Sequence, residues 1–167
     1  VNRSVEAAII ENSPELIACE GLAYDRCQVG IVTNLCSDPR LAEHDIHDEE
    51  QIFKLMRTQV DVVLDTGVAV LNADDAQVAS MAELCDGEVI FFSAIPQATS
   101  RNEQLAGHLA AGGRAVTIDG QQMVLLNGST ANHVHLPADD LSNPAALAAQ
   151  LAATAAAWAL GICVELI

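Results

Sequence analysis

The sequence predicts an α/β fold with three layers, in which helices cover both faces of a largely parallel sheet and two strands form a β-hairpin. Short β-branched runs alternate with amphipathic stretches along the chain, an order typical of parallel strands joined by helices. Several of these runs, such as residues 89–92, are apolar at every position, as strands buried on both faces are. A chain of 167 residues, 51% of them hydrophobic, is long enough for one domain with its own core.

Eight segments are predicted to be strands because they are short, rich in β-branched residues and bounded by polar or glycine residues. They are residues 5–10, 29–33, 60–64, 68–71, 88–92, 114–118, 122–126 and 133–136. The pair 114–118 and 122–126 is joined at Asp119-Gly120, and a short turn of this kind indicates an antiparallel hairpin.

Four helices are predicted between and after these strands. Three begin with a capping-box pattern, in which an Asp or Ser is followed three residues later by Gln or Glu. The fourth begins with an Asn-Pro pair and runs to Gly161, since proline favours the first helical position. The residues that carry these signals are Asp48 with Gln51, Asp74 with Gln77, Ser100 with Glu103, and Asn143 with Pro144.

The charge and cysteine content narrow the function classes. The formal net charge is −16, from 23 acidic and 7 basic side chains, which excludes a general affinity for nucleic acid or anionic lipid. No apolar run reaches the length of a membrane helix. The five cysteines contain no C-x-x-C pair, which predicts reduced thiols in the cytoplasm. Because the first residue is Val1, we expect the chain to be part of a longer or processed protein.

Polar residues follow three of the predicted strands at the edge where open α/β sheets bind ligands. Strand 29–33 ends at Thr33 and is followed by Asn34. Strand 68–71 is followed by Asn72, just before Asp74 and Asp75. The Asn72 amide suits a base edge and the aspartates suit ribose or a metal. The alternative is that Asn72 turns the chain and Asp74 caps a helix.

Glu11 follows the first predicted strand, and its carboxylate suits a hard cation such as magnesium, although a solvated loop acid is the alternative. His44 and His47 lie in an acidic stretch at a helix start, where a solvated cap is favoured over a metal site. The chain contains no G-x-x-x-x-G-K-[ST] phosphate loop, no G-x-G-x-x-G and no G-x-S-x-G motif.

Five stretches of the sequence resemble the cyanophycin synthetase family, over the later part of its Mur-ligase-like domain. The resemblance runs in order along nearly the whole chain, and GLAYDRC followed by VTN is its specific part. The stretches are GLAYDRCQVGIVTN (21–34), RTQVDVVLDTGVAVLNADDAQV (57–78), CDGEVIFFS (85–93), AAGGRAV (110–116) and AAAWALGI (155–162).

The resemblance implies a cytoplasmic, ATP- and Mg²⁺-dependent ligase that proceeds through acyl phosphates. Its Mur-like domain joins arginine to the side-chain carboxylates of an aspartate polymer, and a separate ATP-grasp domain adds the aspartate. The resemblance also implies a homo-oligomer for the full-length enzyme. Residues 1–167 would be part of the Mur-ligase central domain, with the phosphate loop, the ATP-grasp domain and the C-terminal lid domain outside the chain. We therefore expect this chain alone to be inactive.

The resemblance assigns residue roles at the predicted strand ends. Asn72 would contact adenine, Asp75 would lie close to the nucleotide, Thr33 and Asn34 would line the phosphate side, and Glu11 would bind magnesium.

Other matches are less direct. His44 is the nearest histidine for a second metal position, and Lys54 or Arg57 would supply a basic residue toward the nucleotide. The sequence departs from the family at Pro14-Glu15-Leu16, where relatives carry an arginine–glycine–glycine run, and at Pro39-Arg40.

Two other interpretations stay open. One is a different Mur-type ligase, such as a peptidoglycan or folate-polyglutamate enzyme, although residues 21–27 argue against it. The other is a truncated module without catalytic activity.

Overall fold

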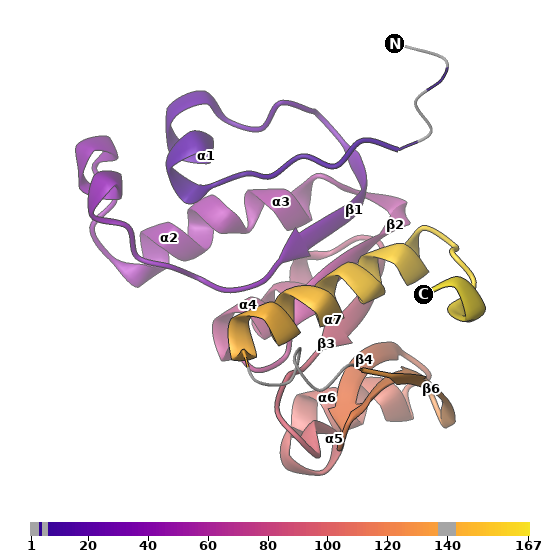
Figure 1. Cartoon of the computed structure of the whole chain (residues 1–167). Coiled ribbons are helices and arrows are strands. Elements are labelled where there is room, and N and C mark those ends of the chain that lie inside the picture. Colours follow the sequence, from indigo (N-terminus) through magenta and orange to yellow (C-terminus); the bar gives the residue numbers. More distant parts are fainter. Residues whose placement is uncertain (1–3, 5–6, 137–142) are drawn as a thin grey trace.

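The computed structural model describes residue 4, residues 7–136 and residues 143–167 (Figure 1). In this part of the chain, six strands form one sheet in the order β1-β2-β3-β4-β5-β6. The pairings from β1 to β4 are parallel, and β5 and β6 extend the sheet antiparallel. This is the predicted α/β fold, with a mixed, largely parallel sheet. The strands are β1 (Cys27–Val32), β2 (Val63–Asn72), β3 (Glu88–Phe92), β4 (Arg114–Asp119), β5 (Gln122–Asn127) and β6 (Thr130–His135).

Each parallel strand pairs with the next one in the sequence, and the connections between them carry helices. Right-handed crossovers between successive neighbours place all their helices on the same face of the sheet. These helices are η1 (Pro39–His44), α2 (Glu49–Met56), α3 (Thr58–Asp61), α4 (Ala76–Ser80), η2 (Met81–Leu84), α5 (Ala98–Arg101) and α6 (Glu103–Ala110), and α1 (Pro14–Glu20) packs against α2 and η1.

The opposite face of the sheet is covered by α7 (Pro144–Ala159), which contacts β1, β2, β3 and β4. Figure 1 shows α7 lying across the sheet before the chain ends near η4 (Val164–Leu166). The core is therefore double. Along β2, Ala69 and Leu71 belong to the cluster under the crossover helices, whereas Val68 and Val70 belong to the cluster under α7. Alternation of side chains along a strand explains this division.

Most of the predicted strands are confirmed. Residues 88–92 form β3, and the predicted hairpin is β4–β5, in which Asp119 pairs with Gln122 across a turn that holds Gly120 at φ 59°. The prediction of a strand at 60–64 is wrong in its first part. Val60 lies in α3, and the chain from Val63 onward continues as β2 through the segment predicted as a separate strand. A short buried apolar run fits a helical turn as well as a strand.

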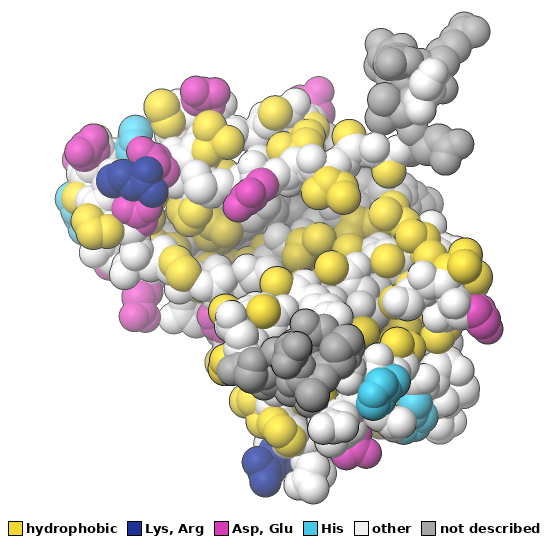
Figure 2. All heavy atoms as spheres, viewed as in Figure 1, with side chains coloured by type: hydrophobic (Ala, Val, Ile, Leu, Met, Phe, Trp, Pro, Cys, Tyr) yellow, Lys and Arg dark blue, Asp and Glu magenta, His cyan; other side chains and the backbone are white. Residues whose placement is uncertain are grey.

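The predicted first strand, 5–10, is wrong for residues 7–10, which have no strand structure, while residues 5 and 6 lie outside the described residues. Ile9 is 96% exposed and Ile10 is 48% exposed. Within the described part of the chain, this segment has no strand partner, so its β-branched residues have no sheet to join. Figure 2 shows hydrophobic side chains gathered in the band between α1 and α7.

Two of the four predicted helix starts are confirmed. Asp48 and Gln51 form a reciprocal capping box, with Gln51 N donating to Asp48 Oδ1 at 2.8 Å, and Asn143 caps α7. The other two predicted starts are wrong. Asp75, not Asp74, caps α4, and Asn102 caps α6, because Ser100 lies inside α5, where its hydroxyl donates to Gln97 O.

Two further features concern membrane-spanning helices and the cysteines. No helix in the described residues is long and apolar enough to cross a membrane. All five cysteines are free thiols, as the sequence predicts.

Candidate functional site

The carboxyl ends of β1 and β2 are joined by the side chain of Asn72. Its Nδ2 donates to the carbonyl oxygen of Thr33 at 2.8 Å, and its Oδ1 accepts from the backbone N–H of Asp74 at 2.9 Å. Asn72 therefore turns the chain at the end of β2, which was the alternative role. An amide has two N–H donors and two acceptor lone pairs, so one donor and one lone pair of Asn72 are left without a partner among the described residues.

Asp74 connects the end of β2 to the end of β3. Its carboxylate accepts from the hydroxyl of Ser93 and, at 2.8 Å, from the backbone N–H of Ala94. Ser93 is fully buried, and sequence reasoning missed it. Its position directly after the apolar strand 88–92, at the same edge as Asn72, was the available signal.

Asp75 caps α4 and holds the loop after β1. One carboxylate oxygen accepts from Gln77 N at 3.0 Å and Val78 N at 3.2 Å, and the other accepts from Leu35 N at 3.4 Å. Backbone N–H groups at a helix start favour a negative charge at this position. Asp75 therefore lies at the strand ends with the residues predicted to share its site.

Thr33 and Asn34 form the exposed end of this cluster. Thr33 Oγ1 donates to Asn34 Oδ1 at 2.8 Å, and Asn34 Nδ2 contacts Cys36 Sγ at 2.6 Å. The structure thus brings Thr33, Asn34, Asn72 and Asp75 to one edge of the sheet, as strand order requires. We call these four residues, with Asp74 and Ser93, the strand-end cluster.

A cavity of about 480 Å³ opens beside the strand-end cluster, between Asp74 and the loop that leads to α6. Asn102 fixes one wall by donating from Nδ2 to the carbonyl oxygen of Ala73 at 2.8 Å. Arg101 lines the same cavity and was not singled out from the sequence. It is the basic side chain that the described structure places in this lining.

Two residues expected near the nucleotide lie in ion pairs on the helix surface instead. Lys54 Nζ is 2.6 Å from Glu50 Oε1, and this hydrogen bond raises the pKa of Lys54. Arg57 Nε is 3.1 Å from Asp61 Oδ2. Both pairs span four residues of helix. No contact described for this chain joins Lys54 or Arg57 to the strand-end cluster.

The predicted metal ligands Glu11 and His44 come from two different segments of the chain. Glu11 is exposed, and His44 is half-buried at the end of η1. Next to Glu11, Asn12 anchors the segment by donating to the Tyr24 hydroxyl at 2.9 Å and to Gln59 Oε1 at 3.2 Å. Among the described residues, no three His, Cys, Asp or Glu side chains come close enough to hold a metal ion.

The two segments that depart from the resembled family contact each other. Arg40 forms an ion pair with Glu15 of α1 and a second one, at 2.6 Å, with Asp38. The hydrogen bond from Arg40 lowers the pKa of Asp38. Glu15 and Arg40 therefore join α1 to η1, which gives both departures a local structural role.

The fold is that of an open, largely parallel α/β sheet with polar residues at the carboxyl ends of its strands, the edge at which α/β proteins commonly bind ligands. The chain is homologous to part of cyanophycin synthetase. It is 35% identical to the enzyme of Crocosphaera subtropica over 97% of this chain, 34% identical to that of Synechocystis over 98%, and 32% identical to that of Geminocystis herdmanii over 98%. The chain spans 19% of the length of each of these relatives. No model of a protein family matches the chain.

Proposed function

We propose that this chain forms the adenine side of an ATP-dependent ligase domain, as part of a protein related to cyanophycin synthetase. The observation that carries the proposal is the strand-end cluster, in which Asn72 keeps one N–H and one lone pair open at the edge of the sheet. Homology along the chain to relatives named cyanophycin synthetase supports the reaction class. The fold then corresponds to part of a Mur-ligase central domain.

In the proposed reaction, a side-chain carboxylate of an aspartate polymer takes the γ-phosphate of ATP to form an acyl phosphate and release ADP. An amine of arginine then attacks the acyl carbon, which forms the amide and releases inorganic phosphate and the amine's proton. The strand-end cluster contributes positioning. Asn72 presents its free amide groups to the adenine edge, and Asp75, which its three N–H donors hold in place, lies close to the ribose side. Fixed groups of this kind orient a nucleotide at no reorganisation cost when it binds.

The described residues supply the base side better than the phosphate side. Lys54 and Arg57 are engaged by Glu50 and Asp61, and Thr33 and Asn34 offer only neutral groups. A single carboxylate, Glu11, does not form a magnesium centre by itself, so we derive no step through a metal. The assignments of Glu11 and His44 to magnesium, and of Lys54 or Arg57 to the nucleotide, stay predictions.

The test is Asn72→Ala in the complete protein that contains this chain. Loss of the adenine contacts raises the KM for ATP in the arginine-adding reaction by roughly ten- to a hundredfold. The aspartate-adding reaction, which we assign to a separate ATP site, changes little. Asn132→Ala, an exposed asparagine on β6, is the matched control. Thermal melts of each variant show whether the fold is intact.

The outcomes separate the alternatives. An unchanged KM for ATP in a normally melting Asn72→Ala protein overturns the nucleotide site. Because Asn72 also turns the chain, a variant that fails to fold is replaced by Asn34→Ala, whose side chain bonds only at the exposed end of the cluster. Absence of any ATP-dependent ligation in the unmodified complete protein favours a module without catalytic activity. Activity with an amino acid other than arginine favours another Mur-type ligase.

A further inference from the structure

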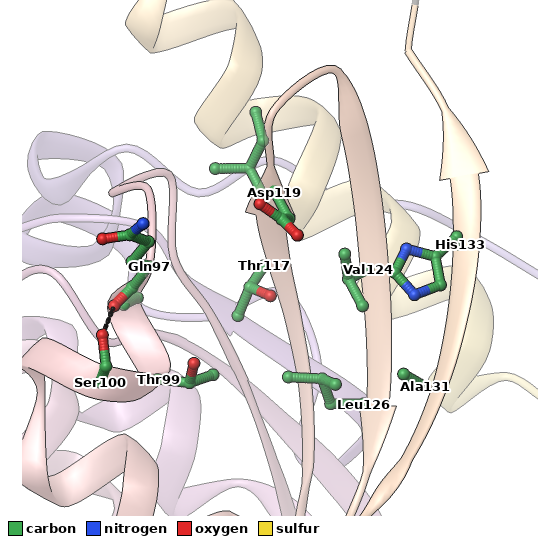
Figure 3. A pocket seen from close by; sticks show the side chains of 11 residues that line it. Gln97, Thr99, Ser100, Thr117, Asp119, Val124, Leu126, Ala131 and His133 are labelled. Carbon is green, nitrogen blue, oxygen red and sulfur yellow. Dashed lines mark hydrogen bonds between the residues drawn. The ribbon is translucent and has the colours of Figure 1, made fainter.

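On the antiparallel part of the sheet, the crossover helix α5 leaves a hollow where it borders one face. A cavity of about 560 Å³ lies on it, within the range of small-molecule sites. Its floor is a cross-strand row in which Thr117 of β4, Val124 of β5 and His133 of β6 are in register. Figure 3 shows these three side chains with Leu126 and Ala131 on the sheet, facing Gln97 and Thr99 on the opposite wall.

Thr117 lines this cavity although the residue itself is almost fully buried. The residue is 5% exposed, yet its hydroxyl makes no hydrogen bond to any residue that the structure describes. In the described part of the chain, every polar side-chain atom that is sealed from solvent has a hydrogen-bond partner, so the unpaired hydroxyl of Thr117 is not sealed. The hydroxyl therefore opens into the cavity (Figure 3). A buried hydroxyl normally has a partner, and a bound molecule would provide one.

The polar lining combines one carboxylate with hydroxyl, amide and imidazole groups, which can donate as well as accept hydrogen bonds. Asp119 stands at the carboxyl end of β4, where it lines the cavity and forms no ion pair with a described residue. Gln97, held at φ 58° at the start of α5, adds an amide, and Thr99 adds a hydroxyl. The lining includes no Lys or Arg side chain. The lining also contains the imidazole of His133, so the charge preference rests on Asp119, whose carboxylate favours a positively charged ligand over phosphate or carboxylate.

The apolar part of the floor defines the rest of the ligand. Val124 is 5% exposed, and Leu126 and Ala131 extend the apolar surface beside it. A methylene stem packs on such a surface while its charged end reaches a carboxylate. We propose that this cavity is a binding site for a small organic cation with an aliphatic stem, of the alkylguanidinium or alkylammonium class, with Asp119 and Thr117 as its anchors.

This site goes beyond the proposed function. It shares no residue with the strand-end cluster, although Ala98 of α5 lines both this cavity and the one beside Asp74. The proposal is therefore tested by binding alone, and its failure says nothing about the nucleotide site.

The experiment titrates n-butylguanidinium, n-butylammonium, neutral N-butylurea and inorganic phosphate into the chain, with binding followed by calorimetry and by backbone amide shifts. At least one of the two cations binds with a dissociation constant in the millimolar range, as small fragments do, and shifts the amides of Thr117 and Val124. N-butylurea and phosphate bind at least about tenfold more weakly. Which cation binds better distinguishes a guanidinium from an ammonium ligand.

Two variants test the anchors. Asp119→Asn weakens binding of the cation by about tenfold or more, since it removes a charge-assisted contact. Asp65→Asn, which removes the same charge from an exposed position on β2, leaves it unchanged. Thr117→Val weakens binding several-fold without loss of thermal stability, because the hydroxyl has no partner to lose within the described structure.

Three results overturn the proposal: no cation binds at millimolar concentration, butylurea or phosphate binds as tightly as the cations, or Asp65→Asn weakens binding as much as Asp119→Asn does. If Thr117→Val or Asp119→Asn does not fold, the amide shifts of the unmodified chain decide. Shifts that map away from β4 and β5 also overturn the site.

Discussion

The helix-covered part of the sheet, β1 to β4, and its antiparallel extension, β5 and β6, differ in what lies on their faces. Val68 to Leu71 of β2 and Ile90 to Phe92 of β3 are buried at every position. In β6, by contrast, residues 130–133 are exposed. Both regions consist of regular paired strands. The core therefore ends within the antiparallel extension, because residues 123–125 of β5 are still buried and residues 130–133 of β6 are not.

The same difference separates the two candidate sites. In the covered part, both faces of the strands are occupied by core, so polar groups collect at the strand ends, as Asn72 and Asp74 do. Where β4 meets the extension, the face opposite α7 carries a cavity that lies on Thr117 of β4 and Val124 of β5. An edge site and a face site thus follow from one topology.

The largest expected effect compares core contacts of the two regions. Leu151 of α7 is fully buried, and Leu151→Ala lowers the free energy of unfolding by about 3 kcal/mol. Val134 of β6 is half-buried, and Val134→Ala lowers the free energy of unfolding by less than about 1 kcal/mol. Urea unfolding of both variants provides the measurement. Equal losses would break the comparison, since they would mean that the extension is packed as tightly as the covered part.

The next effect concerns two glycines. A Cβ atom on Gly87, just before β3, would lie 2.4 Å from the carbonyl oxygen of Gly67 and 2.6 Å from that of Leu64. Gly87→Ala is expected to cost about 2 kcal/mol, because backbone must move.

Gly128, in the turn between β5 and β6, is constrained by its φ of +54° and not by space. Asparagine tolerates this left-handed conformation, so Gly128→Asn costs less than about 1 kcal/mol. Thermal melts of the two variants sharpen the comparison. A larger loss for Gly128→Asn than for Gly87→Ala would contradict it.

The smallest expected effect on stability lies at β4, the strand of the helix-covered part that pairs with the extension. The guanidinium of Arg114 forms two 2.8 Å hydrogen bonds to Glu88 and lies 4.9 Å from the ring of Trp158 on α7. Arg114→Lys keeps the charge but loses the fork and the ring contact, so we expect a loss of about 0.5–1 kcal/mol. Arg57→Lys, in an exposed pair with Asp61, is the control and changes stability by less. Equal changes would show that the contact with Trp158 contributes nothing.

Local patterns made much of the fold predictable. The capping box of Asp48 and the hairpin at Gly120 depend on residues a few positions apart, so the sequence alone carries them. The cap of α4 was predicted one residue early because the capping-box spacing to Gln77 favoured Asp74 over Asp75. Only the arrival of Ser93 and Ala94 from β3 occupies Asp74 and leaves the cap to Asp75.

The candidate site was predictable at the strand ends, because parallel strands bring their carboxyl ends to one edge. Arg101 was not, since the cavity that it lines is assembled by chain packing. The ion pairs of Lys54 and Arg57 could have been predicted from the sequence. Glu50 precedes Lys54 by four residues and Asp61 follows Arg57 by four, a spacing at which helical side chains pair.

The strand order has a consequence for how the molecule is made. Each strand pairs with the one synthesised just before it, so the sheet can grow at one edge as the chain emerges. The exception is α7, which arrives after all six strands and packs against the first four. Until then, Val70, Ile90 and Phe92 face water. The late helix therefore covers this apolar face, and a nascent chain that stalls before Pro144 would present it to chaperones or to other chains.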